Sequence, residues 1–283
     1  MTHVIPNGNE VGGVTSLGDD VFVVRFNSQE KIEAYDANTF TLQRLITVPG
    51  LGDFPLGLTA CPHNNCLYAS DRNNSNVHRV YLSGSNAVMK WSVARGPAGL
   101  SVNSEHNLLV MSRGESKLQI FTTDGTLLEN IQLQADIERP WHAVQLSTGQ
   151  FLVSHSSSLH HVCLVGDDGA VVCSYGGEKG SQLTQMSYPT GLAVDGEGRV
   201  LVAEVGNNRL LMVDKSLSSA HEIPVSVDGG LQRPFSLWYD QPRRRLYVGE
   251  WRGGRVTVVD NLNDFSISTN ELRHEDISTL EHE

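Results

Sequence analysis

A short pattern led by proline recurs along the chain and constrains its fold more than any other feature. Prolines stand at positions 55, 97, 140, 189 and 234, so successive copies lie 42, 43, 49 and 45 residues apart. The clearest copy, from Tyr188 to Asp214, reads YPTGLAVDGEGRVLVAEVGNNRLLMVD. A weaker copy near residue 12 has no proline. The chain is therefore built from six units of roughly 47 residues, a period typical of stacked repeat folds.

Each unit predicts a small antiparallel sheet. Runs of four to six residues rich in Val, Leu, Ile and Tyr alternate with turns of Gly, Asn, Asp and Ser. No segment keeps the helical period for three turns. One such sheet cannot bury both faces alone, but sheets stacked around an axis bury those faces in one another. We therefore expect an all-β, six-bladed β-propeller of four-stranded antiparallel blades, with blades starting near residues 12, 54, 96, 139, 188 and 233.

The two ends of the chain are expected to close the ring. Residues 2–5 (THVI) form a short β-like segment before the first blade, and we expect it to pair as the outer strand of the last blade. The alternative is that Asp264 to Thr269 supplies that strand. Residues 1–269 then form a single propeller. Residues 270–283 carry five acids and one arginine and are expected to form an acidic tail.

Charge and composition narrow the classes of partner. Lys and Arg number 21 against 32 Asp and Glu, which gives a net charge of −11 and disfavours nucleic acid. No apolar run is long enough to span a bilayer, and residues 1–10 do not read as a signal peptide. We expect a cytoplasmic protein with no membrane partner. Its four cysteines are expected to be reduced, although Cys61 and Cys66 flank a four-residue turn that would place them opposite each other.

The fifth unit resembles an NHL repeat. The resemblance rests on three short stretches, which are Pro189-x-Gly191-Leu192-Ala193-Val194-Asp195, Val202-Ala203-Glu204 and Gly206-Asn207-Asn208-Arg209-Leu210. It implies a propeller similar to the C-terminal NHL domain of tripartite-motif proteins, where NHL propellers bind RNA or partner proteins. Related six-bladed propellers include lactonases and a zinc-dependent amidating lyase. Ubiquitin ligation needs RING and B-box zinc sites, and a chain with four cysteines and no Cys-x-x-Cys pair does not carry them.

One position differs most between the units and is expected to carry function. The end of the second strand holds Arg25, Asp71, Arg113, His155, Glu204 and Glu250 in successive blades. Acids there are expected to accept backbone N–H bonds from the following turn. Arginine and histidine cannot cap a turn as carboxylates do. Their side chains are therefore expected to point to solvent, to an acid of a neighbouring blade or to a ligand.

Aromatic and arginine side chains from nearby loops complete the candidate site. Such residues on an exposed rim are typical anchors of protein interfaces. We predict a non-catalytic platform that binds protein or peptide through this loop face and uses no metal or cofactor. The predicted binding face comprises Arg25, Asp71, Arg72, Arg113, Trp141, His142, His155, Glu204, Phe235, Glu250, Trp251 and Arg252.

Two alternatives remain open. A metal-dependent hydrolase or lyase needs three or four convergent ligands, and His142, His155, Glu204 and Glu250 come from adjacent blades. RNA binding through the loop face is the second alternative, although the acids of that face would meet the phosphates. The pair His160-His161 follows a serine-rich stretch and is expected to lie in a solvated turn.

Overall fold

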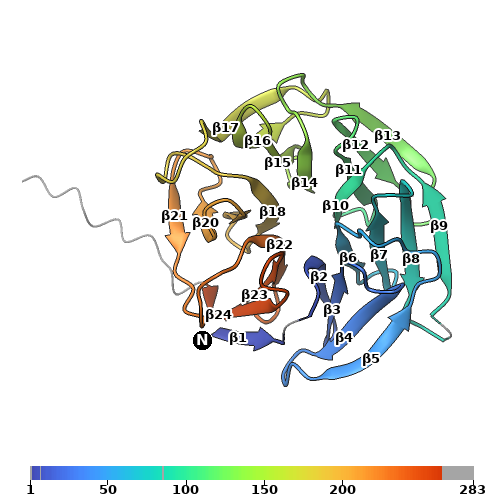
Figure 1. The fold of residues 1–283 in the computed structure, drawn as a ribbon. Coiled ribbons are helices and arrows are strands. Elements are labelled where there is room, and N and C mark those ends of the chain that lie inside the picture. The colour runs from blue at the N-terminus through green and yellow to red at the C-terminus, as the bar shows by residue number, and fades with distance from the viewer. Residues whose placement is uncertain (1, 7, 85, 263–283) are drawn as a thin grey trace, which may run out of the picture.

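The computed structural model describes residues 2–6, 8–84 and 86–262 and forms a closed ring of six four-stranded antiparallel sheets (Figure 1). The predicted all-β, six-bladed propeller is confirmed. No α-helix occurs within these ranges, and they accordingly contain no helix able to span a bilayer. The expected boundary at residue 269 and the acidic tail at 270–283 lie outside the described residues.

Within each blade, the strands are given in order from the one nearest the axis to the one at the outer edge. Blade one comprises β2 (Val11–Leu17), β3 (Asp20–Arg25), β4 (Lys31–Asp36) and β5 (Leu42–Thr47). Blade two comprises β6 (Leu58–Cys61), β7 (Cys66–Asp71), β8 (Asn76–Tyr81) and β9 (Val88–Ser92). Blade three comprises β10 (Pro97–Val102), β11 (Leu108–Ser112), β12 (Lys117–Phe121) and β13 (Leu127–Gln132).

The second half of the ring repeats this plan. Blade four comprises β14 (Pro140–Gln145), β15 (Phe151–Ser156), β16 (His160–Val165) and β17 (Val171–Gly177). Blade five comprises β18 (Pro189–Val194), β19 (Val200–Glu204), β20 (Arg209–Val213) and β21 (Ala220–Ile223). Blade six comprises β22 (Pro234–Asp240), β23 (Arg245–Glu250), β24 (Val256–Asp260) and, at its outer edge, β1 (Thr2–Ile5).

The ring closes through the N-terminal strand, as the sequence predicts. β1 pairs antiparallel with β24, with Thr2 opposite Val259 and Ile5 opposite Val256. Figure 1 shows β1 at the outside of blade six, beside the strands that come from the other end of the chain. The alternative segment, Asp264 to Thr269, lies outside the described residues. This seam covers an edge of β24 that would otherwise present unpaired backbone groups.

The hydrophobic cores lie between blades rather than within them. In β7, Leu67 and Ala69 pack toward blade one, whereas Cys66 and Tyr68 pack toward blade three. The same alternation in β19 divides its residues between blades four and six. A middle strand is therefore buried on both faces, which explains its nearly continuous apolar sequence. Each blade depends on its neighbours to exclude water.

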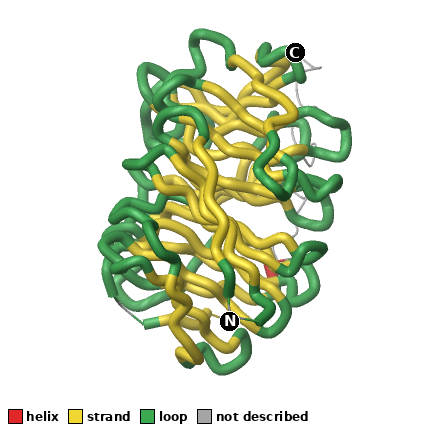
Figure 2. The backbone as a smooth tube through the Cα atoms, turned by 90° about the vertical axis from the view of Figure 1, so that its right-hand side faces the viewer, coloured by secondary structure: helices red, strands yellow, loops and turns green. Residues whose placement is uncertain are grey.

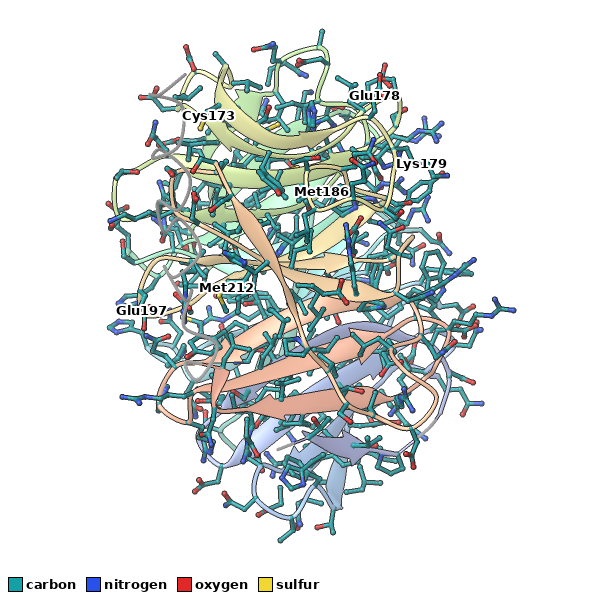
Figure 3. All side chains as sticks on the ribbon, turned by 90° about the vertical axis from the view of Figure 1, so that its left-hand side faces the viewer. Cys173, Glu178, Lys179, Met186, Glu197 and Met212 are labelled. Atoms are coloured by element: carbon teal, nitrogen blue, oxygen red, sulfur yellow. The ribbon has the colours of Figure 1, made fainter. Side chains whose placement is uncertain are left out.

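The loops gather at two opposite faces of the ring (Figure 2). We call one the upper face. It carries the turns between second and third strands and the loops that lead into each inner strand. The lower face carries the remaining turns. Figure 3 shows the ring edge-on. The labelled Glu178 and Lys179 lie on the right, which is the upper face, and Glu197 lies on the left, which is the lower face.

The glycine of the Pro-x-Gly pattern permits close packing of inner strands. A Cβ atom built at Gly191 would lie 2.7 Å from the Phe235 backbone oxygen of blade six. At Gly99 it would lie 2.6 Å from the Trp141 oxygen of blade four. A side chain at either position would collide with backbone. The repeated glycine is therefore required by contact between blades.

Candidate functional site: the upper face

An aromatic cluster lies where the inner strands begin at the upper face. Phe26, Trp141, Phe235 and Trp251 pack with three smaller apolar residues, one each from blades two, three and five. The Phe235 ring meets the rings of Trp141 and Trp251 edge-on, each at a centroid distance of 5.4 Å. Such edge-to-face contacts hold the rings in defined orientations. Phe235 is buried within the cluster, whereas the two tryptophans are partly exposed.

A cavity of about 300 Å³ lies among the inner strands and is partly open to solvent. Trp141 and Phe235 line it near the upper face, and Trp238, Tyr239 and His106 line it toward the lower face. Its walls are mainly apolar, and backbone glycines of several blades contribute to them. The aromatic cluster therefore separates the upper loops from this axial space.

Three blades use an acid at the end of the second strand to hold their loops. Asp71 accepts bonds from the backbone N–H groups of Gly52 and Asn74, at 3.1 and 3.2 Å. Glu204 accepts from the Ser187 N–H and pairs with Arg209. Glu250 accepts from the Gln232 N–H at 2.6 Å and from Arg255 Nε at 2.8 Å. The predicted capping of the following turn is confirmed for Asp71, through the Asn74 N–H. Glu204 and Glu250 instead accept backbone N–H bonds from the loop that leads into their blade, so the prediction for Glu204 is wrong in its partner.

Arg25 also holds loops in place, but it donates hydrogen bonds where the acids accept them. Its Nη1 donates to the carbonyl oxygens of Asn9 and Gly254 at 3.0 and 2.6 Å, and its Nε pairs with Glu33 at 2.7 Å. Arg25 is 5% exposed. The guanidinium therefore links the N-terminal segment to the last blade and is not presented to solvent.

The placement of Arg113 at the end of the second strand is wrong by one residue. Pro97 pairs with Ser112, as Pro189 pairs with Glu204 in blade five. Ser112 is buried and donates to the Arg95 carbonyl oxygen at 2.6 Å. Arg113 is the first residue of the following turn. Its side chain is therefore partly exposed, whereas the side chains of the strand are buried. Sequence alignment alone misses this offset because the proline-to-acid spacing differs slightly between blades.

Arg113 stacks on Trp141 and lies among other arginines. Its guanidinium carbon is 3.6 Å from the centroid of the Trp141 ring, a cation–π contact. Burial, followed by repulsion from the charges of Arg72 and Arg139, lowers the pKa of Arg113 from 12.5 to about 10. The group still carries its charge at neutral pH. Within the described residues it forms no ion pair, and its Nε has no hydrogen-bond partner.

His142 occupies the position of the Pro-x-Gly glycine and links three blades. Its Nδ1 accepts a bond from the Leu192 N–H of blade five, and its Nε2 lies 3.0 Å from the Leu100 oxygen of blade three. These partners fix the neutral tautomer with the proton on Nε2. Burial lowers the pKa of His142, which also favours the neutral ring. The side chain therefore takes the place of the direct backbone contact that glycine permits elsewhere.

The twelve predicted binding-face residues divide by exposure into three groups. The exposed and partly exposed members keep access to a partner, whereas the buried members act only on the loops around them. Arg72 and Arg252 are exposed; Arg113, Trp141, His142 and Trp251 are partly exposed; Arg25, Asp71, His155, Glu204, Phe235 and Glu250 are buried.

Sequence reasoning missed the residue that precedes three of the five repeat prolines. Arg139, Tyr188 and Arg233 precede prolines 140, 189 and 234, and all three adopt left-handed φ angles of 50° to 54°. Such angles are uncommon for residues with a Cβ atom and are often found at functional positions. All three side chains are exposed at the upper face. Aligning the prolines and reading one residue upstream identifies them.

The four residues of the metal-enzyme alternative are engaged separately. Glu204 and Glu250 pair with their own arginines, and His142 is bonded to backbone of two other blades. Among the described residues, one group of three or more His, Cys, Asp or Glu has its ligand atoms close together, and it consists of His155, His161 and Cys163. The expectation that His160 and His161 lie in a solvated turn is wrong, because both begin strand β16.

The cysteines are free thiols in the structure. Cys61 and Cys66 are opposite each other in the β6–β7 pair, as their spacing predicts, and both are buried. Cys163 faces Ser174 rather than Cys173. Cys163 and Cys173 therefore do not form a cross-strand pair.

Parts of the sequence are similar to a known repeat and to a known protein. A model of the NHL repeat matches residues 186–211, which cover the start of blade five. The protein brain tumor of Drosophila melanogaster is 24% identical over 135 residues, which are 46% of this chain and 12% of that protein. The chain thus matches only a small part of that relative.

Solved structures share the fold at low sequence identity. A catalytically inactive variant of virginiamycin B lyase from Staphylococcus aureus, determined with quinupristin, superposes with a TM-score of 0.67 at 12% identity, covering 92% of this chain and 85% of that one. A nidogen–laminin complex gives 0.67 at 16% identity, covering 82% and 86%. These likenesses show the fold alone. The chain is a six-bladed β-propeller whose fifth blade matches the model of the NHL repeat.

Proposed function

We propose that this protein is a non-catalytic platform that binds protein or peptide partners through its upper face. The observation that carries the proposal is the environment of Arg113, a charged and partly exposed guanidinium with no carboxylate partner among the described residues. Stacking on Trp141 holds it in place. A carboxylate supplied by a partner would give it the charge-assisted hydrogen bonds that it lacks.

The surrounding residues favour a partner that is acidic and aromatic. Arg72 and Arg139 add positive charge near Arg113. Trp251 is partly exposed and Phe54 is 42% exposed on the same face. The acids Asp53 and Glu138 are exposed there as well, so the rim mixes both signs. Aromatic and arginine anchors with a mixed polar rim are typical of protein interfaces. A cytoplasmic setting belongs to this proposal.

A pair of labelled peptides tests the platform. One alternates glutamate with tyrosine, and the other has lysine in place of glutamate. Fluorescence anisotropy is expected to show binding of the glutamate peptide only. Arg113→Ala should weaken that binding about tenfold or more, because a charge-assisted hydrogen bond contributes about 1.5–3 kcal/mol. Arg244→Ala, in the β22–β23 turn of the lower face, is the matched control and should leave the affinity unchanged.

The same assay separates the alternatives. Equal binding of both peptides, or an Arg113→Ala variant that binds as the wild type does, would contradict the platform. An oligouridylate RNA provides the third probe. Tighter binding of this RNA than of the glutamate peptide, with loss in Arg113→Ala and at higher salt, would replace peptide recognition by RNA recognition.

A further inference from the structure

Two histidines and a cysteine come together on one side of blade four. His155 lies opposite His161 in the β15–β16 pair, and Cys163 lies opposite Val153. Because side chains alternate between the two faces of a sheet, His155, His161 and Cys163 project from the same face. Cys163 belongs to the core between blades three and four, with Leu109 and Met111. The cluster is therefore set at the edge of that core.

The distances within the cluster suit a metal ion. His155 Nε2 lies 3.5 Å from Cys163 Sγ, and one ligand atom from each of the three side chains lies within 4.8 Å of the others. Tetrahedral zinc, with Zn–N near 2.0 Å and Zn–S near 2.3 Å, places such a nitrogen and sulfur about 3.5 Å apart. The His155–Cys163 separation already matches this value. A small rotation of the half-buried His161 ring would bring in the third ligand.

Hydrogen bonding does not account for the position of His155. The residue is 1% exposed, and its Nδ1 has no hydrogen-bond partner. Its Nε2 faces only the weakly bonding sulfur. The adjacent His160 differs, because its Nδ1 accepts the Tyr188 N–H at 3.0 Å. A buried imidazole without a strong partner is uncommon and calls for a specific explanation.

The surroundings provide access and negative charge. His161 is partly exposed, and a Cβ atom at the neighbouring Gly177 would lie 3.5 Å from His161 Nε2, so this side is lined by a residue without a side chain. Asp136, exposed in the loop before β14, exerts a negative field on His155, His161 and Cys163 alike. One thiolate and one nearby carboxylate together balance a divalent cation.

We propose that His155, His161 and Cys163 form a zinc-binding site between blades three and four. Binding exchanges the S–H bond of Cys163 for an S–Zn bond and releases that proton to solvent, while the two imidazoles donate neutral nitrogen lone pairs. The fourth position of the tetrahedron is left for water, with Asp136 as the neighbouring counter-charge. This site is independent of Arg113 and of the proposed peptide surface.

Cobalt(II) replaces zinc as a spectroscopic probe of the site. Tag-free, reduced protein titrated with Co²⁺ should develop a thiolate-to-cobalt charge-transfer band and intense visible bands typical of tetrahedral coordination, with one ion bound per chain. Zn²⁺ should abolish both sets of bands. Zn²⁺ should also raise the midpoint of thermal unfolding, because it binds only the folded site.

Variants assign the ligands. Cys163→Ser should remove the charge-transfer band, and His161→Gln, at a partly exposed position, should weaken Zn²⁺ binding at least tenfold while the protein stays folded. Cys173→Ser, in the next strand, is the matched control and should keep both properties. A missing band in the wild type, or a band that persists in Cys163→Ser and disappears in Cys173→Ser, would overturn the proposal. Unchanged zinc affinity in His161→Gln would do the same if Cys163→Ser failed to fold.

Discussion

Blades four and five are neighbours with the same four-stranded plan, but they use the end of the second strand differently. In blade five, Glu204 binds the Ser187 N–H, Asn207 and Arg209, so both oxygens of the buried carboxylate are engaged. In blade four the equivalent residue is His155, since Pro140 pairs with His155 as Pro189 pairs with Glu204. His155 has an unpartnered nitrogen and a thiol beside it.

This difference separates residues that hold the ring from residues available for binding. Blade five matches the NHL repeat, and its polar side chains form hydrogen bonds with the loops around them. Blades three and four depart from the repeat, and each has a polar side chain with an unpartnered nitrogen, Arg113 Nε in blade three and His155 Nδ1 in blade four. Buried polar atoms without a partner also occur in other blades, as in His78 of blade two. What distinguishes Arg113 and His155 is the aromatic ring or the thiol beside each group, and we expect binding there.

Deletion of residues 1–10 is expected to have the largest effect on the stability of the protein. It removes β1, leaves the edge of β24 unpaired and takes away the Pro6 and Asn9 carbonyl partners of Arg25. Thermal melts followed by circular dichroism should show a larger drop in midpoint than any single substitution below. A midpoint equal to that of the full chain would show that the seam contributes nothing.

Removing the acid of blade five should have the next largest effect. Glu204→Ala leaves Arg209 buried without its main partner, which typically costs about 3–5 kcal/mol. Glu222→Ala is the control, because Glu222 is 57% exposed and lies 3.9 Å from the same arginine. It should change the free energy of unfolding by about 0.5 kcal/mol or less. Urea unfolding that finds equal losses in both variants would remove the structural role of Glu204.

The histidine link of blade four should make stability sensitive to acid. Burial lowers the folded-state pKa of His142 below the ordinary value near 6.5. Its contribution is therefore complete above pH 6.5 and is lost as the pH falls toward the folded-state pKa, because the unfolded chain takes up the proton first. His142→Gln should show a shallower loss than the wild type between pH 7.5 and 5. Parallel urea-derived stability curves would contradict the account.

Much of the fold is readable from the sequence because its cause is local and repeated. The proline spacing and the alternating strands predict six blades, and the β-like segment before the first blade predicts the seam formed by Thr2–Ile5. Reading Pro140-x-His142 against Pro189-x-Gly191 also exposes the histidine in a glycine position. Its partners, Leu100 and Leu192, belong to other blades and emerge only in three dimensions.

The candidate sites are less readable because they depend on register and turn length. A single-residue offset moves Arg113 from the strand end into a turn and puts buried Ser112 in its place. The His155–Cys163 contact depends on the β15–β16 register, which the serine-rich sequence between these strands conceals. Burial of Glu204 and Glu250 follows from loops that fold over them. The sequence of a single blade does not predict how those loops fold.

Anisotropy titration of the glutamate–tyrosine peptide against Arg113→Ala is the most direct test of the distinction between structural and available polar groups. The substitution removes one cation–π contact, so its cost in stability should stay near 1 kcal/mol and the variant should remain folded. We predict that a variant of near wild-type stability loses about tenfold or more in peptide affinity. A folded Arg113→Ala protein that binds the peptide as tightly as the wild type would contradict the account.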